Sequence, residues 1–365
     1  MSTPTILPDE IRSLTDDQAH ALIENVKKKW GSKIVILGHH YQKDEVIVHS
    51  DFTGDSLKLA KIAKEQKAAK HIIFCGVHFM AESADMLTDG ACEVCLPDMA
   101  AGCDMADMAD AKDLQIAWDD ATHEGLEGIV PVTYINSTAA LKAIVGRNGG
   151  IICTSSNAKA VVKWALERGK HILFLPDQHL GRNICKAMGF DHNKDMLLWD
   201  PKKYLGGHSA DVLKKTKIWL WAGHCPVHAL FTVHQIKRIR ETNPETKILV
   251  HPECSMEIVD VSDLNGSTDF IIKTIQAAPA GSSWAIGTEK NLVDRLAKDN
   301  PDKKIFSLNP YSCACGTMNR ISLKHLAWVM DCIDKGQSMP NRIQVPPSIA
   351  KDAKLALDRM MSVVV

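Results

Sequence analysis

The sequence predicts an α/β protein made of three similar domains, each with a small parallel sheet of three or four strands flanked by helices. Two observations carry this prediction. Short apolar runs that end in turn residues alternate with helical segments of about a dozen residues or more, which is typical of parallel strands joined by helical crossovers. The pattern of strands also restarts twice with a period of about one hundred residues, which is too long for a solenoid repeat.

Each of the three sets in this repeating pattern contains three expected strands. The first strand of a set ends in His, Tyr, Asn, Glu or Cys, and the third runs into a loop that carries Pro with Asp or Asn. The sets are residues 33–42, 71–82 and 92–107; residues 128–137, 150–159 and 171–183; and residues 247–256, 269–279 and 304–316. We therefore expect α/β domains at residues 20–118, 119–232 and 233–339, with a C-terminal helix at residues 340–365 that packs back on the first domain.

The ends of the first strands are where a site is expected. In open parallel sheets, ligands bind at the carboxyl ends of the strands, where loops and helix N-termini converge. If the three domains turn these ends toward one another, one cavity is lined by His39, Tyr41, Tyr134, Asn136, His251 and Glu253.

Charge and composition favour a small-molecule partner. Lys and Arg total 43 while Asp and Glu total 44, so no basic surface is expected for nucleic acid or an anionic membrane. The N-terminus is polar and acidic, and no run of about 18 apolar residues occurs. We expect a cytoplasmic protein, in which thiols stay reduced. Clustered cysteines then indicate metal binding or catalysis rather than disulfides.

The 11 cysteines fall into two groups. Four lie in apolar strand or helix patterns, where a cysteine is usually a small buried hydrophobic residue: Cys75, Cys153, Cys185 and Cys332. Seven lie in loops or just past strands: Cys92, Cys95, Cys103, Cys225, Cys254, Cys313 and Cys315. The CEVC stretch does not open a helix as a thioredoxin-type pair does, and no local group of four ligands suits zinc. A site built from one thiolate of each of three distant loops remains open as an alternative. The loops are AGCDMAD, WAGHCPVH and CACGTMNR.

Several motifs follow one another in a familiar order: GHHYQ, DFTGDSLKLA, TYINS, CTSSNA, LPDQHLGRN, WAGHCPVH, HPEC, GST and CGTMNR. Together they resemble the quinolinate synthase family, iron-sulfur enzymes of bacterial NAD biosynthesis. The resemblance runs from near Ile34 to near Leu323. It implies three α/β domains related by a pseudo-threefold axis and a central four-iron four-sulfur cluster with one cysteine from each domain. No protein thiolate would bind the fourth iron.

The resemblance places the cluster ligands at Cys103, Cys225 and either Cys313 or Cys315. The loop of the family has Met three residues after its ligand, and Cys315 keeps this spacing to Met318, so Cys315 is expected. Some relatives have a C-x-x-C-x-x-C run here, whereas this chain has CAC. Cys313 is therefore left open as a second thiol beside the cluster or a redox-active one.

The implied reaction condenses iminoaspartate with dihydroxyacetone phosphate to quinolinate, with loss of phosphate and two waters. L-Aspartate oxidase or another source of iminoaspartate would be the partner. An iron without a protein ligand acts as a Lewis acid, so no electron need be transferred. Ser56, Ser155 and Thr268 are expected at helix N-termini, where backbone N–H groups bind phosphate or carboxylate, and simple helix capping is the alternative.

The resemblance also assigns the remaining side chains. The catalytic residues would be Tyr41, Glu253, His251 and His228, which could move the protons of enolisation, imine formation and dehydration. Substrate binding would use His39, Ser56, Tyr134, Asn136, Ser155, His251, Glu253 and Thr268. A structural role at a strand end is the alternative for any one His or Tyr.

Two other classes of protein are compatible with the cysteines. An Fe–S carrier usually brings four thiolates and needs no anion-binding hydroxyl groups at helix starts. A zinc hydrolase would use His and carboxylate ligands at closer spacing.

Overall fold

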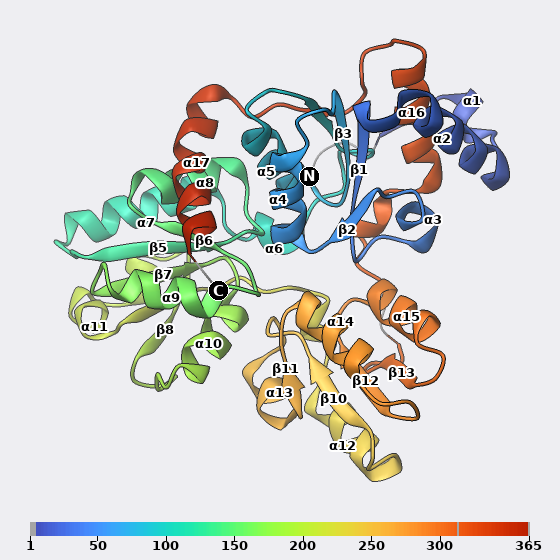
Figure 1. The fold of residues 1–365 in the computed structure, drawn as a ribbon. Helices are drawn as coiled ribbons and strands as arrows, with labels where there is room; N and C mark the ends of the chain where they lie inside the picture. Colours follow the sequence, from blue (N-terminus) through green and yellow to red (C-terminus); the bar gives the residue numbers. More distant parts are fainter. Residues whose placement is uncertain (1–4, 312–313, 364–365) are drawn as a thin grey trace. The chain divides into compact units, whose positions relative to one another are not determined.

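The computed structural model describes residues 5–311 and 314–363 (Figure 1). The chain forms two compact units. The first consists of Met1–Cys103, Lys290–Leu292 and Cys313–Pro346, and the second of Asp104–Glu289, Val293–Ser312 and Pro347–Val365. Within the described residues, the first unit has one mainly parallel sheet and the second unit has two.

The sheet of the first unit has the strand order β14-β4-β3-β1-β2. Its strands are β1 (Ile34–His39), β2 (Phe52–Gly54), β3 (His71–Cys75), β4 (Glu93–Cys95) and β14 (Arg342–Ile343). All pairs are parallel except β14 with β4. Every residue of β1 is buried, which explains its continuous apolar run, because a central parallel strand is covered on both faces.

The second unit contains sheets with the orders β6-β5-β7-β9-β8 and β11-β10-β12-β13. The strands of the first of these are β5 (Ile129–Tyr134), β6 (Ile151–Cys153), β7 (His171–Leu175), β8 (Met196–Trp199) and β9 (Ile218–Trp221). Those of the other are β10 (Lys247–Val250), β11 (Leu264–Asn265), β12 (Ser283–Gly287) and β13 (Lys304–Ser307). All neighbouring strands in both sheets are parallel.

The three sheets share one topology. When strands are numbered within their own sheet, each order begins 2-1-3, as β2-β1-β3, β6-β5-β7 and β11-β10-β12. This confirms the predicted α/β class with three similar domains. In the described part of the chain, two of the sheets have five strands and one has four, so the expected size of three or four strands is wrong for two of them. The strands not predicted in these two sheets are β2, β14, β8 and β9, each of only two to four residues, too few to give a periodic signal.

One predicted strand is a helix. Residues 269–279 fall mostly in α14 (Thr268–Ala277), and the third strand of that sheet is β12. Two apolar residues of the stretch, Ile271 and Ile275, lie four positions apart and are both buried, as on one face of a helix. The Ser267 side chain caps the helix by accepting a hydrogen bond from the Phe270 amide (3.3 Å).

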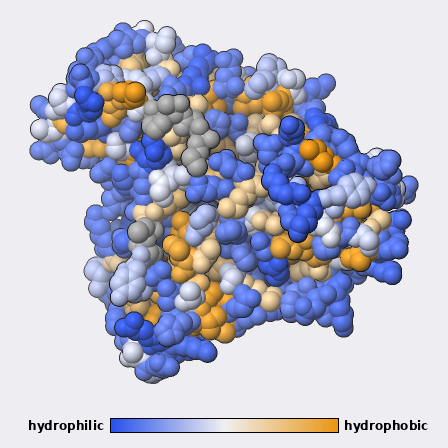
Figure 2. Space-filling view, turned by 180° about the vertical axis from the view of Figure 1, so that it is seen from behind, coloured by the Kyte–Doolittle hydropathy of each residue, from blue (hydrophilic) through white to orange (hydrophobic). Residues whose placement is uncertain are grey.

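Helices connect and flank the strands. In chain order they are α1 (Asp9–Arg12), α2 (Asp16–Trp30), α3 (Asp44–Ile47), α4 (Ser56–Glu65), α5 (His78–Thr88), α6 (Asp104–Asp107), α7 (Ala111–His123), α8 (Ala139–Arg147), α9 (Ala158–Leu166), α10 (Gln178–Ala187), α11 (Ala210–Lys215), α12 (Val233–Thr242), α13 (Met256–Val261), α14, α15 (Lys290–Asp299), α16 (Leu323–Asp334) and α17 (Pro347–Ser362). Short 3₁₀ helices are η1 (Gly31–Lys33), η2 (Tyr204–Gly207), η3 (His228–Leu230) and η4 (Met318–Arg320). No helix in the described part of the chain has the length and apolarity needed to cross a membrane. Figure 2 shows mostly hydrophilic residues on one face, with hydrophobic residues in small groups.

The C-terminal segment packs in two places. Strand β14 pairs with β4 in the first sheet, whereas α17 packs against α8 and β6. The expectation that the final helix packs on the first domain is therefore wrong for α17. The contact with α8 depends on Gly146, because a Cβ there would lie 2.0 Å from the carbonyl oxygen of Asp352. The domain boundaries themselves stay a prediction.

We expect Gly146→Ala to destabilise the protein. Alanine in a helix usually stabilises it relative to glycine, but here the new methyl group meets backbone of α17, and such overpacking costs about 1–3 kcal/mol. The measurement is the midpoint of thermal or urea unfolding. A variant more stable than the parent would show that α17 does not pack this closely on α8.

Candidate active site

The first strand of each sheet ends at a switch point in the strand order. β1, β5 and β10 each lie between the second and third strands of their sheet, where the chain order reverses. Ligands of open parallel sheets bind beside such a point. At these three strand ends, or within three residues beyond them, lie His39, Tyr41, Tyr134, Asn136, His251 and Glu253.

Three hydroxyl residues occupy equivalent places beside these strand ends. In each sheet, the residue at the end of the first strand, or directly after it, has a partner on the second strand. The hydroxyl residue lies two positions after that partner. The pairs and their hydroxyl residues are His39–Gly54 with Ser56, Tyr134–Cys153 with Ser155, and His251–Gly266 with Thr268. The last pair extends the recorded pairing of Val250 with Asn265 by one residue. The equivalence supports a shared role for the three hydroxyl groups.

Ser56 and Thr268 begin helices without being their caps. Ser56 is the first residue of α4, whose cap is Asp55, and Thr268 is the first residue of α14, whose cap is Ser267. Neither residue is therefore the N-cap of its helix. Both are buried, at 9% and 4% exposure.

Ser155 differs from the other two. It lies in the turn before α9, and the N-cap of that helix is Asn157. The expectation that Ser155 begins a helix is thus wrong by three residues. The turn is held by the side chain of Asn157, which accepts a hydrogen bond from the Thr154 amide (2.6 Å).

In the second unit, Glu253 lies in a group of polar side chains. Its Oε2 lies 2.9 Å from Nδ1 of His228, and the Tyr134 hydroxyl donates to the same carboxylate. The rings of His228 and His251 have centroids 4.9 Å apart. Ligand atoms of Cys225, His228 and Glu253 all lie within 4.8 Å of one another, so these three could hold a metal ion. The structure thus brings together residues that come from separate loops.

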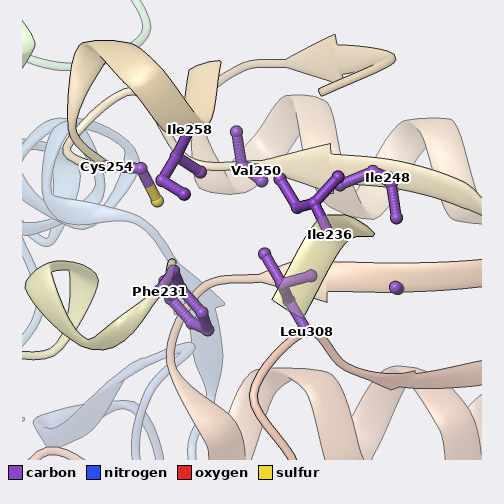
Figure 3. Packing of buried hydrophobic residues seen from close by; sticks show 8 residues of the cluster. Phe231, Ile236, Ile248, Val250, Cys254, Ile258 and Leu308 are labelled. Atoms are coloured by element: carbon purple, nitrogen blue, oxygen red, sulfur yellow. The ribbon is translucent and has the colours of Figure 1, made fainter. Parts of the chain in front are cut away.

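An apolar cluster fixes the loops that carry this group. Cys254, directly after Glu253, and Phe231, three residues after His228, both belong to it (Figure 3). The other buried members are Ile236, Ile248, Val250, Ile258, Ala285 and Leu308. Because Cys254 and Phe231 are anchored in one core, the backbone segments that carry Glu253 and His228 are tied to the same cluster.

Nearby charges and hydrogen bonds favour the ionised form of Glu253, which can accept a proton. Burial opposes its charge, but the charges of His251 and His228, together with hydrogen bonds from His228 and the Tyr134 hydroxyl, outweigh burial and lower the pKa of Glu253. Burial lowers the pKa of His251 to about 4, against the opposing effect of Glu253. These directions favour Glu253 as a carboxylate, which can accept a proton, and His251 as a neutral imidazole. The charge of His251 lowers the pKa of Glu253 only while His251 is protonated.

In the first unit, the loop after β1 meets the loop that carries Cys315. The side-chain amide of Asn291 donates to the carbonyl oxygen of Tyr41 and to Oδ1 of Asn319, both at 2.9 Å. The backbone amide of Asn319 donates to the carbonyl oxygen of Cys315 (2.9 Å). The Tyr41 amide donates to Nδ1 of His39 (3.2 Å), so the end of β1 is linked to the cysteine loop.

The three predicted ligand cysteines share one position relative to the following helix. Each lies seven residues before an N-cap whose side chain accepts a hydrogen bond from the helix. The pairs are Cys103 with Asp110 before α7, Cys225 with Thr232 before α12, and Cys315 with Ser322 before α16. A 3₁₀ helix also begins three residues after both Cys225 and Cys315. The open question about Cys313 lies outside the described residues.

These cysteines are also the partly exposed ones among the ten that the structure describes. The buried ones are Cys75, Cys92, Cys95, Cys153, Cys185, Cys254 and Cys332. Burial raises the pKa of Cys75 and of Cys185 to about 12, so these thiols stay protonated and make poor metal ligands. The partly exposed set fits a thiolate-bound metal group.

Two residues of this region were missed from the sequence, Asp177 and Thr288. Asp177 is fully buried two residues after β7, and burial, followed by the nearby charge of Glu253, raises its pKa well above the usual range. The Thr288 hydroxyl lies 3.2 Å from Nε2 of His228, one residue after β12. Extending the strand-end rule from first strands to third strands would have found both.

Known proteins resemble this chain over almost its full length. The family described as quinolinate synthetase A protein, NadA, matches residues 21–362. A quinolinate synthase of Corynebacterium glutamicum is 52% identical over 360 residues, covering 98% of this chain and 91% of that protein. A quinolinate synthase of Bacillus subtilis is 52% identical over 362 residues, covering 98% and 96%, and one of Geobacillus thermodenitrificans is 51% identical over 356 residues with the same coverage. The chain therefore belongs to the quinolinate synthetase A family.

Proposed function

We propose that this protein is a quinolinate synthase that condenses iminoaspartate with dihydroxyacetone phosphate in NAD biosynthesis. The products are quinolinate, phosphate and two waters, and the equation balances without an oxidant or reductant. The proposal includes a cytoplasmic location and a supply of iminoaspartate from L-aspartate oxidase or another source. Support comes from membership of the family and from the chemistry of the side chains described above.

We propose that Cys103, Cys225 and Cys315 bind one four-iron four-sulfur cluster. The observation that carries this assignment is their common place, seven residues before a capped helix, together with their partial exposure. The same spacing favours Cys315 over Cys313, which lies nine residues before Ser322. When bound, such a cluster supplies a Lewis-acidic iron that can polarise a hydroxyl or carboxylate oxygen.

The protein itself would bind and orient two anionic substrates. Ser56 and Thr268, at the first positions of α4 and α14, stand beside backbone N–H groups that attract phosphate or carboxylate. Ser155 would act from the turn before α9. Asn136 has a buried Oδ1 without a hydrogen-bond partner among the described residues, which makes it an acceptor for a substrate N–H or O–H group. His39 and Tyr41 would complete the binding surface.

Proton transfer would centre on Glu253. As a buried carboxylate beside His228, it can take a proton from a substrate carbon or nitrogen and return it to a leaving hydroxyl group. The Tyr134 hydroxyl, which donates to Glu253, fixes its orientation and can also donate to a substrate oxygen. His251 would orient substrate as a neutral donor or acceptor, and Tyr41 would serve as a second hydroxyl donor.

A zinc-dependent hydrolase is the second candidate, because Cys225, His228 and Glu253 alone could hold a single metal ion. The deciding experiment is purification without oxygen, followed by metal analysis and an assay with both substrates. We expect a brown protein with about four irons per chain, as a four-iron cluster requires, and formation of quinolinate. Stoichiometric zinc without iron, and no quinolinate, would favour the hydrolase.

Activity should decay in air. An iron without a protein ligand is the one most easily lost on oxidation, so aerobic dialysis with a chelator should remove iron and activity together. Iron content and quinolinate formation are measured in the dialysed sample and compared with those of an aliquot kept anaerobic. Full activity after such dialysis would contradict an exposed iron.

A further inference from the structure

Glu253 sits in a short irregular loop between β10 and α13, which has little regular hydrogen bonding of its own. The loop is tied to the third sheet by the amide of His251, which donates to the carbonyl oxygen of Gly287 (3.0 Å), and is closed by the Cys254 amide, which donates to His251 (3.0 Å). The carbonyl groups of Pro252 and Cys254, on either side of Glu253, need partners from elsewhere because both residues are buried.

Asn183 supplies both partners. Its side-chain Nδ2 donates to the carbonyl oxygen of Pro252 (2.9 Å) and to that of Cys254 (2.8 Å). A primary amide has two N–H groups, so one nitrogen can serve both carbonyl groups while remaining neutral. Asn183 is only 6% exposed, which keeps water from replacing these bonds. The two bonds restrain the backbone immediately before and immediately after Glu253.

Asn183 is itself held in a fixed place, because α10 packs closely on the second sheet. A Cβ at Gly181 would lie 2.7 Å from both Leu220 and Phe174, so this glycine permits a close approach of the helix to β7 and β9. At the start of the helix, Oδ1 of Asp177 accepts hydrogen bonds from the amides of His179 (2.7 Å) and Leu180 (3.2 Å).

The start of α10 also adjoins the loop that leads to Cys225. The Gln178 amide donates to the carbonyl oxygen of Gly223 (3.0 Å), and the Gly223 amide donates to that of Pro176 (3.1 Å). The helix that holds Asn183 is therefore linked by backbone hydrogen bonds to the loop that carries a predicted ligand.

We propose that Asn183 is a positioning residue for Glu253. Through its two hydrogen bonds it transmits the fixed place of α10 to the Glu253 backbone and so aims the carboxylate at His228. The inference rests on the catalytic role proposed for Glu253. The motif LPDQHLGRN, which ends in Asn183, thereby serves the chemistry of a residue about seventy positions away in the chain.

The test compares Asn183→Leu with Lys186→Met. Leucine keeps a similar volume but removes both donors. Lys186 also lies on α10, and its ammonium group pairs with Asp260 of α13 (2.6 Å). Lys186→Met therefore breaks a surface contact between α10 and α13. We expect Asn183→Leu to lower kcat about ten- to a hundredfold, as small misplacements of reacting groups do, while KM and cluster absorbance change little. Lys186→Met should match the parent.

A double-mutant cycle separates positioning from general stability. If Asn183 acts through Glu253, Asn183→Leu should have almost no further effect on the residual rate of Glu253→Gln. An equal loss in both backgrounds would overturn the inference, as would an Asn183→Leu enzyme with parental kcat. Absence of quinolinate formation by the parent would instead reject the proposed function.

Asn183→Ser provides a second test if the leucine variant does not fold. The smaller serine side chain leaves room for water at the two carbonyl groups. We expect it to retain cluster absorbance and to lose kcat by a smaller factor. Failure of both variants to fold would assign Asn183 to stability alone and overturn the inference.

Discussion

Cys225→Ser should yield a colourless protein without quinolinate synthase activity. A neutral hydroxyl group is a poor substitute for thiolate on iron, so loss of one of the three proposed ligands should release the proposed cluster. Cys103→Ser and Cys315→Ser should behave in the same way, because the three residues hold equivalent places before their helices. The measurements are visible absorbance, iron content and quinolinate formation, all without oxygen.

Cys92→Ser is the matched control. Cys92 is buried, burial raises the pKa of its thiol, and a serine hydroxyl can keep the contact that the thiol makes with Thr88. We expect this variant to keep its colour and activity, and Cys95 and Cys254 to tolerate the same change with respect to the cluster. If Cys313→Ser bleached the protein and Cys315→Ser did not, the ligand would lie two residues earlier than proposed.

The sequence predicted the three-domain α/β class because the first strand of every domain is a central strand. Central parallel strands are buried on both faces, and their apolar runs, such as Ile34–His39, stand out. Several short strands did not stand out: β2, β11 and β14 have three, two and two residues. The strand predicted at residues 269–279 is a helix. A short, strongly apolar helix and a buried strand look alike in sequence unless the cap at Ser267 is considered.

The site divides in the same way. Strand ends selected His39, Tyr134 and His251 because the topology of parallel sheets alone puts them at a switch point. The contact of His228 with Glu253 needed the structure, because it joins η3 to the loop after β10 and no spacing in the sequence encodes that contact. The sequence singled out the LPDQHLGRN motif that ends in Asn183 but not the role of this residue. Its role depends on the backbone carbonyl groups it meets, and these carry no sequence signal.

Glu253→Gln should lower quinolinate formation about a hundred- to ten-thousandfold, which is the usual contribution of a positioned acid or base. The substitution keeps shape and volume but removes the proton acceptor. Because the pKa of Glu253 is lowered, its carboxylate form is favoured at neutral pH, and the loss should appear there. The variant should fold, keep its cluster and bind dihydroxyacetone phosphate through Ser56, Ser155 and Thr268.

Glu257→Gln is the matched control, since Glu257 lies in the first turn of the adjacent helix α13 and is exposed. It should retain parental turnover at equal iron content. If Glu253→Gln also stayed within about threefold of the parent, a factor too small for a lost acid or base, Glu253 would have a structural role. Proton transfer would then fall to Tyr41 and His251. Because burial holds His251 neutral, with a pKa of about 4, that outcome would require Tyr41 to supply the acidic proton.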